Sequence, residues 1–528
     1  MKGTARISLL AGLAAVLLAQ PVAAATPEQI EDSIDRGLAW LATQQQADGS
    51  WLYTADIPDI CRDIATTALV VVKFEERAKE LGLDPFDPGQ YEYASNVIQG
   101  LDYIFTYAIS DANGVYLPCY DTYNTGTALM AVSASGAPAR VITTGPLVGS
   151  DYQSAAAGMA AWLSFAQNRT GDAFDCDVGG WGYFSRYDGF SDQSNSGYAT
   201  LGLGFAAGQE AFALTIPADV LSRLSLYVDN VQDPVDGDSY DGGSWYEPCS
   251  NFKWVNILKT GNLLYELALV GDDPATSQRI QDAIDYIEAH WNVVGPQPEF
   301  PATSLGWRDA YQAMFTMMKG LESLRINTLS VGGSDIDWFD EVSDLIVANQ
   351  APDGSMNALT DPPYGEGEIS ANLRTAWALL TLERVVDIPK IEVPVDIHPT
   401  SCPNPINVGS KGLTPVAILG TADFDVSTID PATIMLQGIS PIRWAIEDVA
   451  TPYEPFVGKE GAYACNMYGP DGYFDLTLKF NTQALAAALG AVSDRQVLVV
   501  TLTGSLKEEF GGTQIIGEDV VIILKKGK

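Results

Sequence analysis

Six segments of the sequence combine acids, amides, aromatic rings and basic side chains where short apolar stretches begin. Aromatic rings beside hydrogen-bonding groups suit a sugar, because a sugar's apolar face stacks and its hydroxyl groups need donors and acceptors. A tyrosine or lysine beside an arginine could instead remove a proton next to a uronate carboxylate, which is polysaccharide lyase chemistry. The candidate ligand-binding residues are Asp63, Asp121, Tyr123, Asp192, Asn195, Tyr198, Lys253, Trp254, Arg308, Asp309 and Arg374.

The acids and amides among these candidates have a structural alternative. Asp, Asn and Ser at the start of a helix accept hydrogen bonds from its free backbone N–H groups and interact favourably with the helix dipole. A cation at a helix start opposes that dipole, so the basic candidates point more strongly to an acidic partner or an anionic ligand. These basic candidates are Lys253, Arg308 and Arg374.

Two acidic loops have oxygen-rich patterns that suit calcium. The segment 236–241 alternates Asp with Gly and Ser, although its fifth and sixth positions break the EF-hand pattern. The segment 471–475 has only D-G-x-x-D, which a turn also explains. The histidines are His290 and His398 and no C-x-x-C occurs, so the sequence predicts no zinc site and no certain cofactor.

The six cysteines are an even number, which fits an oxidising compartment and a set of disulfides. Fifteen pairings exist, and spacing favours one of them. Two cysteines stand alone in the C-terminal quarter, two precede predicted helices of successive repeats, and two occupy the next two loops. The expected pairs are Cys61–Cys119, Cys176–Cys249 and Cys402–Cys465.

These candidates stand within a diverged internal repeat that runs from about residue 30 to 386. The segments 45–51 (QQADGSW) and 350–356 (QAPDGSM) are its clearest copies, and four further copies lie between them. The first and last Asp-Gly pairs are 305 residues apart over five steps, or 61 residues per repeat. A repeat of this length indicates a helical array in which each unit packs on its neighbours.

Each repeat has an amphipathic helix, a Gly/Asp/Trp loop and a second helix that is apolar nearly all round. Such a second helix is buried on both faces, whereas a one-sided stripe belongs on the outside. Six hairpins closed on themselves predict an α6/α6 toroid over residues 26–386, with an inner and an outer helix ring. The expected inner helices are 65–72, 126–132, 198–207, 258–268, 311–321 and 373–382.

The Q-x-x-D-G-S-W copies resemble the repeats of the prenyltransferase/squalene-cyclase superfamily, and the segment 179–199 is similar to secreted bacterial members. The resemblance implies an α/α-toroid with a cavity lined by the inner helices. A squalene-type cyclase would need a D-x-D-D cluster, and the nearest match, 335–340, precedes an outer helix. A protein prenyltransferase would need a zinc-binding histidine in an inner segment. The resemblance therefore implies the fold and leaves the activity open.

The composition changes after Val386. Prolines punctuate the segment 387–400, which predicts an extended linker. Short β-rich runs follow at 415–419, 434–436, 475–480, 496–503 and 519–524, separated by turn residues. They predict a small β-sandwich over residues 401–528. The stretch 395–405 resembles a C-terminal module of uncharacterised secreted bacterial proteins.

The 528-residue chain begins like an exported protein. Lys2 and Arg6 precede an apolar stretch, and an A-x-A site follows at 23–25, which predicts a signal peptide over residues 1–25. The net charge of −38 disfavours nucleic acid and anionic membranes, and no later stretch is long enough to span a bilayer. We expect a soluble protein of the periplasm or exterior.

The leading interpretation is a secreted toroid protein that binds an extracellular ligand such as a glycan, with a β-module as an accessory. The alternative is an enzyme. A polysaccharide lyase, with Tyr123, Tyr198 or Tyr311 as base and Arg308 or Lys253 as cation, comes before a terpenoid-cyclase-like activity.

Overall fold

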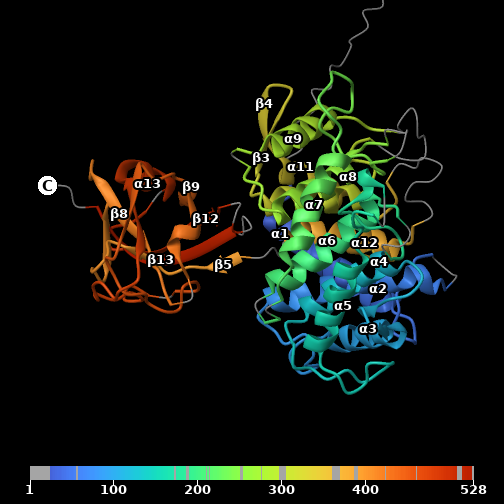
Figure 1. Cartoon of the computed structure of the whole chain (residues 1–528). Coiled ribbons are helices and arrows are strands. Elements are labelled where there is room, and N and C mark those ends of the chain that lie inside the picture. The colour runs from blue at the N-terminus through green and yellow to red at the C-terminus, as the bar shows by residue number, and fades with distance from the viewer. Residues whose placement is uncertain are drawn as a thin grey trace, which may run out of the picture.

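The computed structural model describes residues 24–525 except 55–57, 172–173, 186–188, 210, 213, 250–253, 275, 296–304, 360–368, 386–389, 423, 460, 491, 508–509 and 511–513. Helices α1–α12 form one unit and strands β5–β13 form a second (Figure 1). The predicted signal peptide lies outside the described residues, apart from its last two. None of the helices in the described part of the chain is long and apolar enough to cross a membrane.

The described helices of the first unit pair into six hairpins, each with an outer and an inner member. The outer helices are α1 (Pro27–Gln44), α3 (Ala94–Tyr107), α5 (Tyr152–Ala166), α7 (Ala218–Val231), α9 (Gln278–His290) and α11 (Trp338–Asn349). The inner helices are α2 (Ile60–Glu80), α4 (Asp121–Ala134), α6 (Gln193–Gly208), α8 (Ile257–Leu269), α10 (Tyr311–Ser323) and α12 (Ala371–Glu383). Two small β-hairpins lie between helices: β1 (Ile109–Asp111) with β2 (Gly114–Tyr116) between α3 and α4, and β3 (Thr328–Val331) with β4 (Ser334–Asp337) between α10 and α11.

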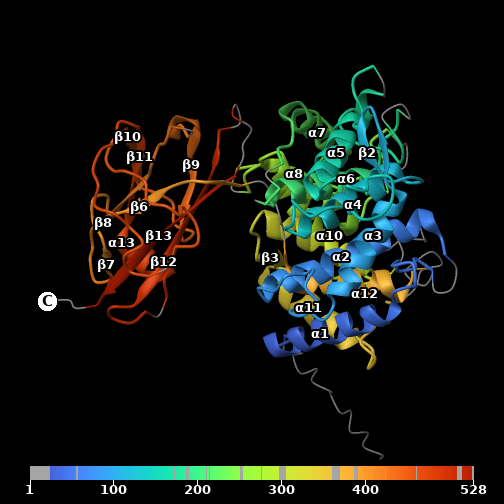
Figure 2. The ribbon, with the colours of Figure 1, turned by 90° about the horizontal axis from the view of Figure 1, so that it is seen from below.

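The inner helices form a closed ring. Each packs against the next along the chain, and α12 packs against α2. In Figure 2, α1 likewise lies beside α11, so the first and last repeats meet. Burial follows the expected pattern: all but one of the 13 residues of α8 are buried, whereas only five of the 18 residues of α1 are. The predicted toroid is therefore the fold of this unit.

The repeated glutamine at the end of an outer helix joins neighbouring repeats. Gln350 Nε2 donates to Gly354 O in its own loop and to Ser33 O in α1, both at 2.9 Å, and so ties the last repeat to the first. The same pair of bonds, to its own loop glycine and to a backbone carbonyl of the next repeat, is made by Gln45, Gln167 and Gln232.

The repeated glycine allows this close approach. Gly354 has φ +99°, and a Cβ there would lie 2.2 Å from Arg36 O in α1. Gly179 has φ +95°, and a Cβ there would lie 1.8 Å from Arg223 O in α7. Only glycine has neither the steric penalty of positive φ nor a Cβ to collide with the neighbouring helix. The Gln and Gly of the repeat motif are thus structural residues that link consecutive repeats.

The second unit has two β-sheets around an apolar core. One sheet has the order β10–β11–β8–β6, and the other has β5–β13–β12–β9 with β7 also paired to β13. Helix α13 (Thr482–Ala488) follows β11. The strands are β5 (Lys390–Glu392), β6 (Val395–Ile397), β7 (Asn404–Asn407), β8 (Leu413–Ile418), β9 (Ile429–Leu436), β10 (Arg443–Glu447), β11 (Asp475–Asn481), β12 (Val497–Leu506) and β13 (Gln514–Leu524).

The segment 387–400 differs from the linker that the sequence predicts. Strands β5 and β6 lie within it, and each belongs to a different sheet of the second unit. Pro394 and Pro399 flank β6 and do not interrupt it, because proline is tolerated beside a strand end. Proline density is therefore a poor guide to the boundary of this β unit.

Candidate functional site

A cavity of about 350 Å³ lies at the mouth of the toroid, where the inner helices begin. Its walls come from loops and first helical turns of several repeats, so the closed ring of hairpins positions them. The lining combines four tyrosine rings with one guanidinium, one amide, one threonine hydroxyl and several apolar side chains. The polar and aromatic lining residues are Tyr53, Arg62, Thr66, Tyr120, Tyr123, Asn124 and Tyr183.

Two tyrosines packed at a tilt form the floor of this cavity. The rings of Tyr123 (α4) and Tyr198 (α6) have centroids 4.2 Å apart. The Tyr198 hydroxyl accepts hydrogen bonds from Trp377 Nε1 of α12 at 3.2 Å and from Gln312 Nε2 of α10 at 3.4 Å. Helices α6 and α12 are three hairpins apart, so these bonds bridge the centre of the ring. Burial raises the pKa of both tyrosines, so both hydroxyls stay protonated at neutral pH.

A chain of aromatic contacts leaves the cavity along the mouth. The Arg62 guanidinium lies 4.9 Å from the centre of the Tyr53 ring and is hydrogen-bonded to Tyr120. The Tyr120 and Tyr183 rings have centroids 5.3 Å apart. The Tyr183 and Tyr246 hydroxyl oxygens are 3.2 Å apart, which continues the chain into the fourth repeat.

The chain of contacts ends at a lysine. Trp254 packs on Tyr246 with ring centroids 4.5 Å apart, and Lys259 Nζ lies 4.1 Å from the centre of the Trp254 ring. We name the whole set the aromatic arc. It comprises Tyr53, Arg62, Tyr120, Tyr183, Tyr246, Trp254 and Lys259, and it crosses four successive repeats.

Lys259 is the chemically unusual member of the aromatic arc. It lies in the first turn of α8 with 3% of its surface exposed. Among the described residues no carboxylate oxygen lies within 4.0 Å of its Nζ, and its neighbours are the Trp254 and Tyr246 rings. Burial lowers the pKa of Lys259 well below its ordinary value. Burial among rings thus favours the neutral form of the amine, which can accept a proton.

The predicted acids at helix starts bind backbone groups. Asp63 accepts from the N–H groups of Tyr53 and Asp59 at 2.7 and 2.8 Å. Asp192 caps α6 by accepting from the N–H groups of Ser194 and Asn195. The Asp192 bonds are the capping contacts of the structural alternative, whereas Asp63 binds backbone N–H groups that precede α2. Burial raises the pKa of both carboxyls.

The other predicted polar residues are similarly placed. Asn195 Nδ2 donates to Asp192, and Asp309 accepts from the N–H of Gly295 at 2.7 Å. Asp121 is the first residue of α4.

Two of the three predicted basic residues are described, and both bind groups of the protein itself. Arg308 pairs with Glu341 of α11 and lies over the Trp307 ring. Arg374 donates to the carbonyl of Ile369. Lys253 lies outside the described residues. Of the predicted candidates, the structure brings Tyr123, Tyr198 and Trp254 to the cavity floor or the aromatic arc, whereas Arg308 and Arg374 bind protein groups.

Sequence reasoning missed Tyr53, Tyr183 and Tyr246, although a signal was present. Each stands four residues after the glycine of its repeat motif: Gly49, Gly179 and Gly242. The same loops also carry a large Trp, which is the more prominent repeated residue: Trp51, Trp181 and Trp245. That Trp is a core residue in repeats one and three, where its Nε1 donates to a carbonyl of the outer helix.

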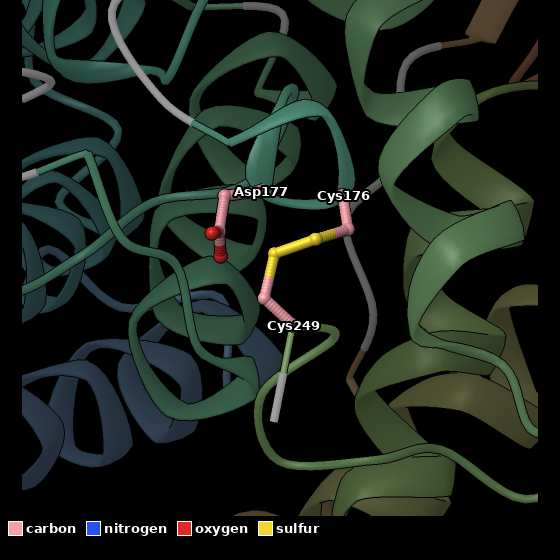
Figure 3. Close-up of side chains that lie close together, drawn as sticks. All are labelled: Cys176, Asp177 and Cys249. Carbon is pink, nitrogen blue, oxygen red and sulfur yellow. A yellow bond between two sulfur atoms is a disulfide. The ribbon is translucent and has the colours of Figure 1, made fainter. Parts of the chain in front are cut away.

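In the described part of the chain, two groups of residues have ligand atoms close enough together to hold a metal ion. Cys176, Asp177 and Cys249 form one, but the two sulfurs are joined in a disulfide, as Figure 3 shows. Thiolate ligation is therefore excluded while that bond is formed.

The second group is Asp233, Asp238 and Asp241. Asp241, in the loop where the sequence allows calcium, accepts from the N–H groups of Gly237 and Asp238. In the other predicted calcium loop, the Asp475 carboxylate accepts from three N–H groups, those of Gly420, Val449 and Ala450.

The expected disulfides are those of the structure: Cys61–Cys119, Cys176–Cys249 and Cys402–Cys465. The first joins the first turn of α2 to the loop before α4 beside the cavity, and the second joins the loops of repeats three and four. Both therefore hold parts of the mouth that carry the aromatic arc.

No family model matches the chain, and no curated protein matches it. Solved structures do. An inactive variant of the α-1,6-mannanase GH76A of Salegentibacter sp. HEL1_6, in complex with α-1,6-mannotriose, is 10% identical with a TM-score of 0.43, covering 67% of this chain and 98% of that one. A D-mannose isomerase is 11% identical with a TM-score of 0.45, covering 68% and 97%.

A possible GH105 member from Salmonella enterica serovar Paratyphi A is 11% identical with a TM-score of 0.41, covering 71% of this chain and 98% of that one. Similarity at this level carries no argument about activity. The fold is shown by the closed ring of hairpins in this chain. Its function is inferred below from the residues at the mouth of the toroid.

Proposed function

We propose that this protein is exported and binds an extended extracellular glycan along the aromatic arc. The observation that carries the proposal is the continuity of the arc across four repeats, beginning in a cavity of about 350 Å³. Stacking faces placed in a row suit a chain of sugar units, whereas a single small ligand would need only the cavity.

The polar groups of the arc support the same proposal. Sugar hydroxyl groups need donors and acceptors, and Arg62 and the Tyr183 hydroxyl of the arc, with Asn124 Oδ1 of the cavity lining, supply both beside the rings. Two disulfides join neighbouring repeats at the mouth and restrain it in the free protein. Less conformational entropy would therefore be lost when a ligand binds there. Export is supported by the three disulfides, which persist in oxidising compartments.

Kinship with the prenyltransferase/squalene-cyclase superfamily remains part of this proposal. It is supported by the recurring Gln and Asp-Gly loops, whose role in this chain is to link repeats. The acidic segment 335–340, the nearest match to a cyclase motif, begins on the exposed hairpin of β3 and β4.

The test is a glycan-array screen of the mature protein, followed by calorimetric titration of each hit. α-1,6-Mannooligosaccharides are one probe, and neutral plant and algal oligosaccharides are others. Replacing Tyr183 or Tyr120 with Ala should weaken binding about 5-fold or more, since a stacking aromatic ring contributes about 1 kcal/mol or more. Tyr463→Ala, at an exposed tyrosine of the β unit, is the matched control. The proposal fails if no glycan binds, or if all three variants bind like the parent.

Lys259 favours a second candidate function, a polysaccharide lyase. A neutral amine in an aromatic site can remove the proton next to a uronate carboxylate. Arg62, which would neutralise that carboxylate, stands at the opposite end of the aromatic arc, so this candidate ranks second. Uronate polymers would be incubated with the protein and the absorbance of unsaturated products followed. A lyase predicts product from the parent and none from Lys259→Met; absence of product from the parent rejects it.

A further inference from the structure

A buried lysine of the β unit, Lys459, faces the carboxylate of Asp519. Lys459 stands on the segment between β10 and β11, and Asp519 is in β13. The side chains of both are 1% exposed, and Lys459 Nζ lies 3.3 Å from Asp519 Oδ1. The amine is thus held beside one carboxyl oxygen where water has almost no access.

The other oxygen of Asp519 is held by two donors. Oδ2 accepts from the N–H of Ile397 at 2.6 Å and from Asn404 Nδ2 at 2.8 Å. Donors aimed at one oxygen of a carbonyl carbon stabilise the charge that develops there when a nucleophile attacks, as in an oxyanion hole. Oδ1 accepts from the N–H of Val520 at 2.9 Å and faces Lys459 Nζ, which also donates to Val395 O at 3.2 Å. The Asp519 carboxyl thus has two fixed donors on Oδ2, and the amine approaches it at Oδ1.

A third group can move the proton. Asp396 in β6 lines the same small cavity as Lys459 and Asp519, and the cavity has a volume of about 10 Å³. Asp396 is 8% exposed, and its Oδ1 has no hydrogen-bond partner among the described residues. Burial and the neighbouring Asp519 raise the pKa of Asp396 to about 7, so a large share of it carries a proton at neutral pH. A cavity this small holds at most one water, which favours loss of water over hydrolysis.

We propose that Lys459 and Asp519 join in an intramolecular amide bond, with Asp396 as the proton carrier. The Lys459 ammonium passes a proton to the carboxyl groups, and its Nζ lone pair forms a bond to Asp519 Cγ. The charge gathers on Oδ2, held by Ile397 and Asn404. Oδ1 then takes protons, one of them through Asp396, its bond to Cγ breaks, and it leaves as water. An ammonium and a carboxylate become an amide and one water, so no oxidant or cofactor is needed.

The cross-link would act beside an existing disulfide. Cys465, six residues after Lys459, is joined to Cys402 near β7. The amide would tie the same long segment to β13, so the segment would remain attached in a reducing solution.

The decisive measurement is the intact mass of the mature, full-length protein, before any variant is made. With three disulfides counted, the mass should be lower than the sequence value by that of one water. After reduction and digestion, the loss should appear in a branched peptide that joins Lys459 to Asp519. The unmodified mass in a folded protein, or a loss found at other residues, overturns the proposal.

Variants test the part played by each group. Lys459→Arg and Asp396→Ala should both abolish the loss of water in chains whose near-ultraviolet circular dichroism still shows a folded protein. Lys479→Arg, on β11, makes the same change without touching the site and should retain the loss. If Asp396→Ala retains the loss in full, Asp396 is not the proton carrier and the proposed step is wrong.

Discussion

The two ends of the inner helix ring each bury a lysine, in opposite settings. At the mouth, Lys259 lies against the Trp254 and Tyr246 rings. Toward the other end, Lys73 of α2 forms a fully buried ion pair with Glu383, the last residue of α12. Burial lowers the pKa of both lysines, and that of Lys73 falls to about 7 even with Glu76 nearby.

This difference distinguishes the closed ring of hairpins, which we call the frame, from the candidate site at its mouth. The Lys73–Glu383 pair joins the first and last inner helices and so helps to close the ring. Lys319 and Glu76, 4.0 Å apart, add a second pair between α10 and α2. At the mouth, Lys259 has aromatic faces where Lys73 has a carboxylate. The paired lysine therefore belongs to the closed ring, and Lys259 belongs to the candidate site.

The largest effect should come from breaking the ion pair. Lys73→Met leaves Glu383 buried without its cation and should lower the free energy of unfolding by about 3–5 kcal/mol. Lys259→Met removes a buried amine from an aromatic site and should cost less than about 1 kcal/mol. Urea unfolding of the two variants measures both values. Equal losses would contradict the distinction between frame and site.

A buried acid on the same helix as Lys259 should make stability depend on pH. Burial raises the pKa of Glu266 to about 8, with a hydrogen bond from Gln193 opposing the shift. The folded state then holds a proton that the unfolded chain releases above about pH 4.3. The stabilisation is complete below that value and is lost as pH rises through about 8.

The matched variant is Glu266→Gln, which cannot titrate. Between about pH 6 and 8, the difference in free energy of unfolding between the parent and Glu266→Gln should fall by about 2 kcal/mol. Urea titrations at several pH values measure it. A difference that is constant or rises with pH would show that Glu266 is ionised in the folded protein.

The repeat glutamines should stabilise the frame more weakly, one joint at a time. Gln45→Ala removes the Nε2 bonds to Gly49 O and Asn96 O, both 3.0 Å long, and should cost about 1–3 kcal/mol. Gln46→Ala, at the exposed neighbouring residue, should cost less than about 0.5 kcal/mol. Thermal unfolding of the pair is sufficient. Similar unfolding midpoints for the two variants would mean that the repeated Gln of the motif does not stabilise the contact between repeats.

The smallest effect concerns one hydroxyl of the aromatic arc. Tyr183→Phe keeps the ring and removes the contact with the Tyr246 hydroxyl, so glycan affinity should fall about 5-fold, or about 1 kcal/mol. Tyr198→Phe, at the cavity floor, is the comparison, since its hydroxyl bonds to Trp377 and Gln312. Calorimetric titration should show a change in affinity for Tyr183→Phe and mainly a loss of stability for Tyr198→Phe. The reverse result would indicate that the glycan binds at the cavity floor and not along the aromatic arc.

Much of the frame could be predicted, because it repeats. The spacing of Gln and Asp-Gly identified six units, and the all-apolar second helices identified the inner ring. Capping also follows local rules, and Asp192 accepts the N–H bonds expected of a residue before a helix. A helix start does not determine side-chain direction, so the described basic candidates bind protein groups: Arg308 reaches Glu341 on the next outer helix, and Arg374 the carbonyl of Ile369.

The sequence by itself determined the hairpins, the closed ring and the cysteine pairs, since each depends on periodic or local patterns. Only the tertiary structure decided which side chains share a surface. The aromatic arc joins Tyr53, Tyr183 and Tyr246, which are up to 193 residues apart in the chain and meet because the ring brings successive loops to one mouth. The partner of each buried lysine was decided in the same way. Whether a lysine faces a carboxylate or an aromatic ring depends on the neighbouring helix or strand, and no local pattern carries that information.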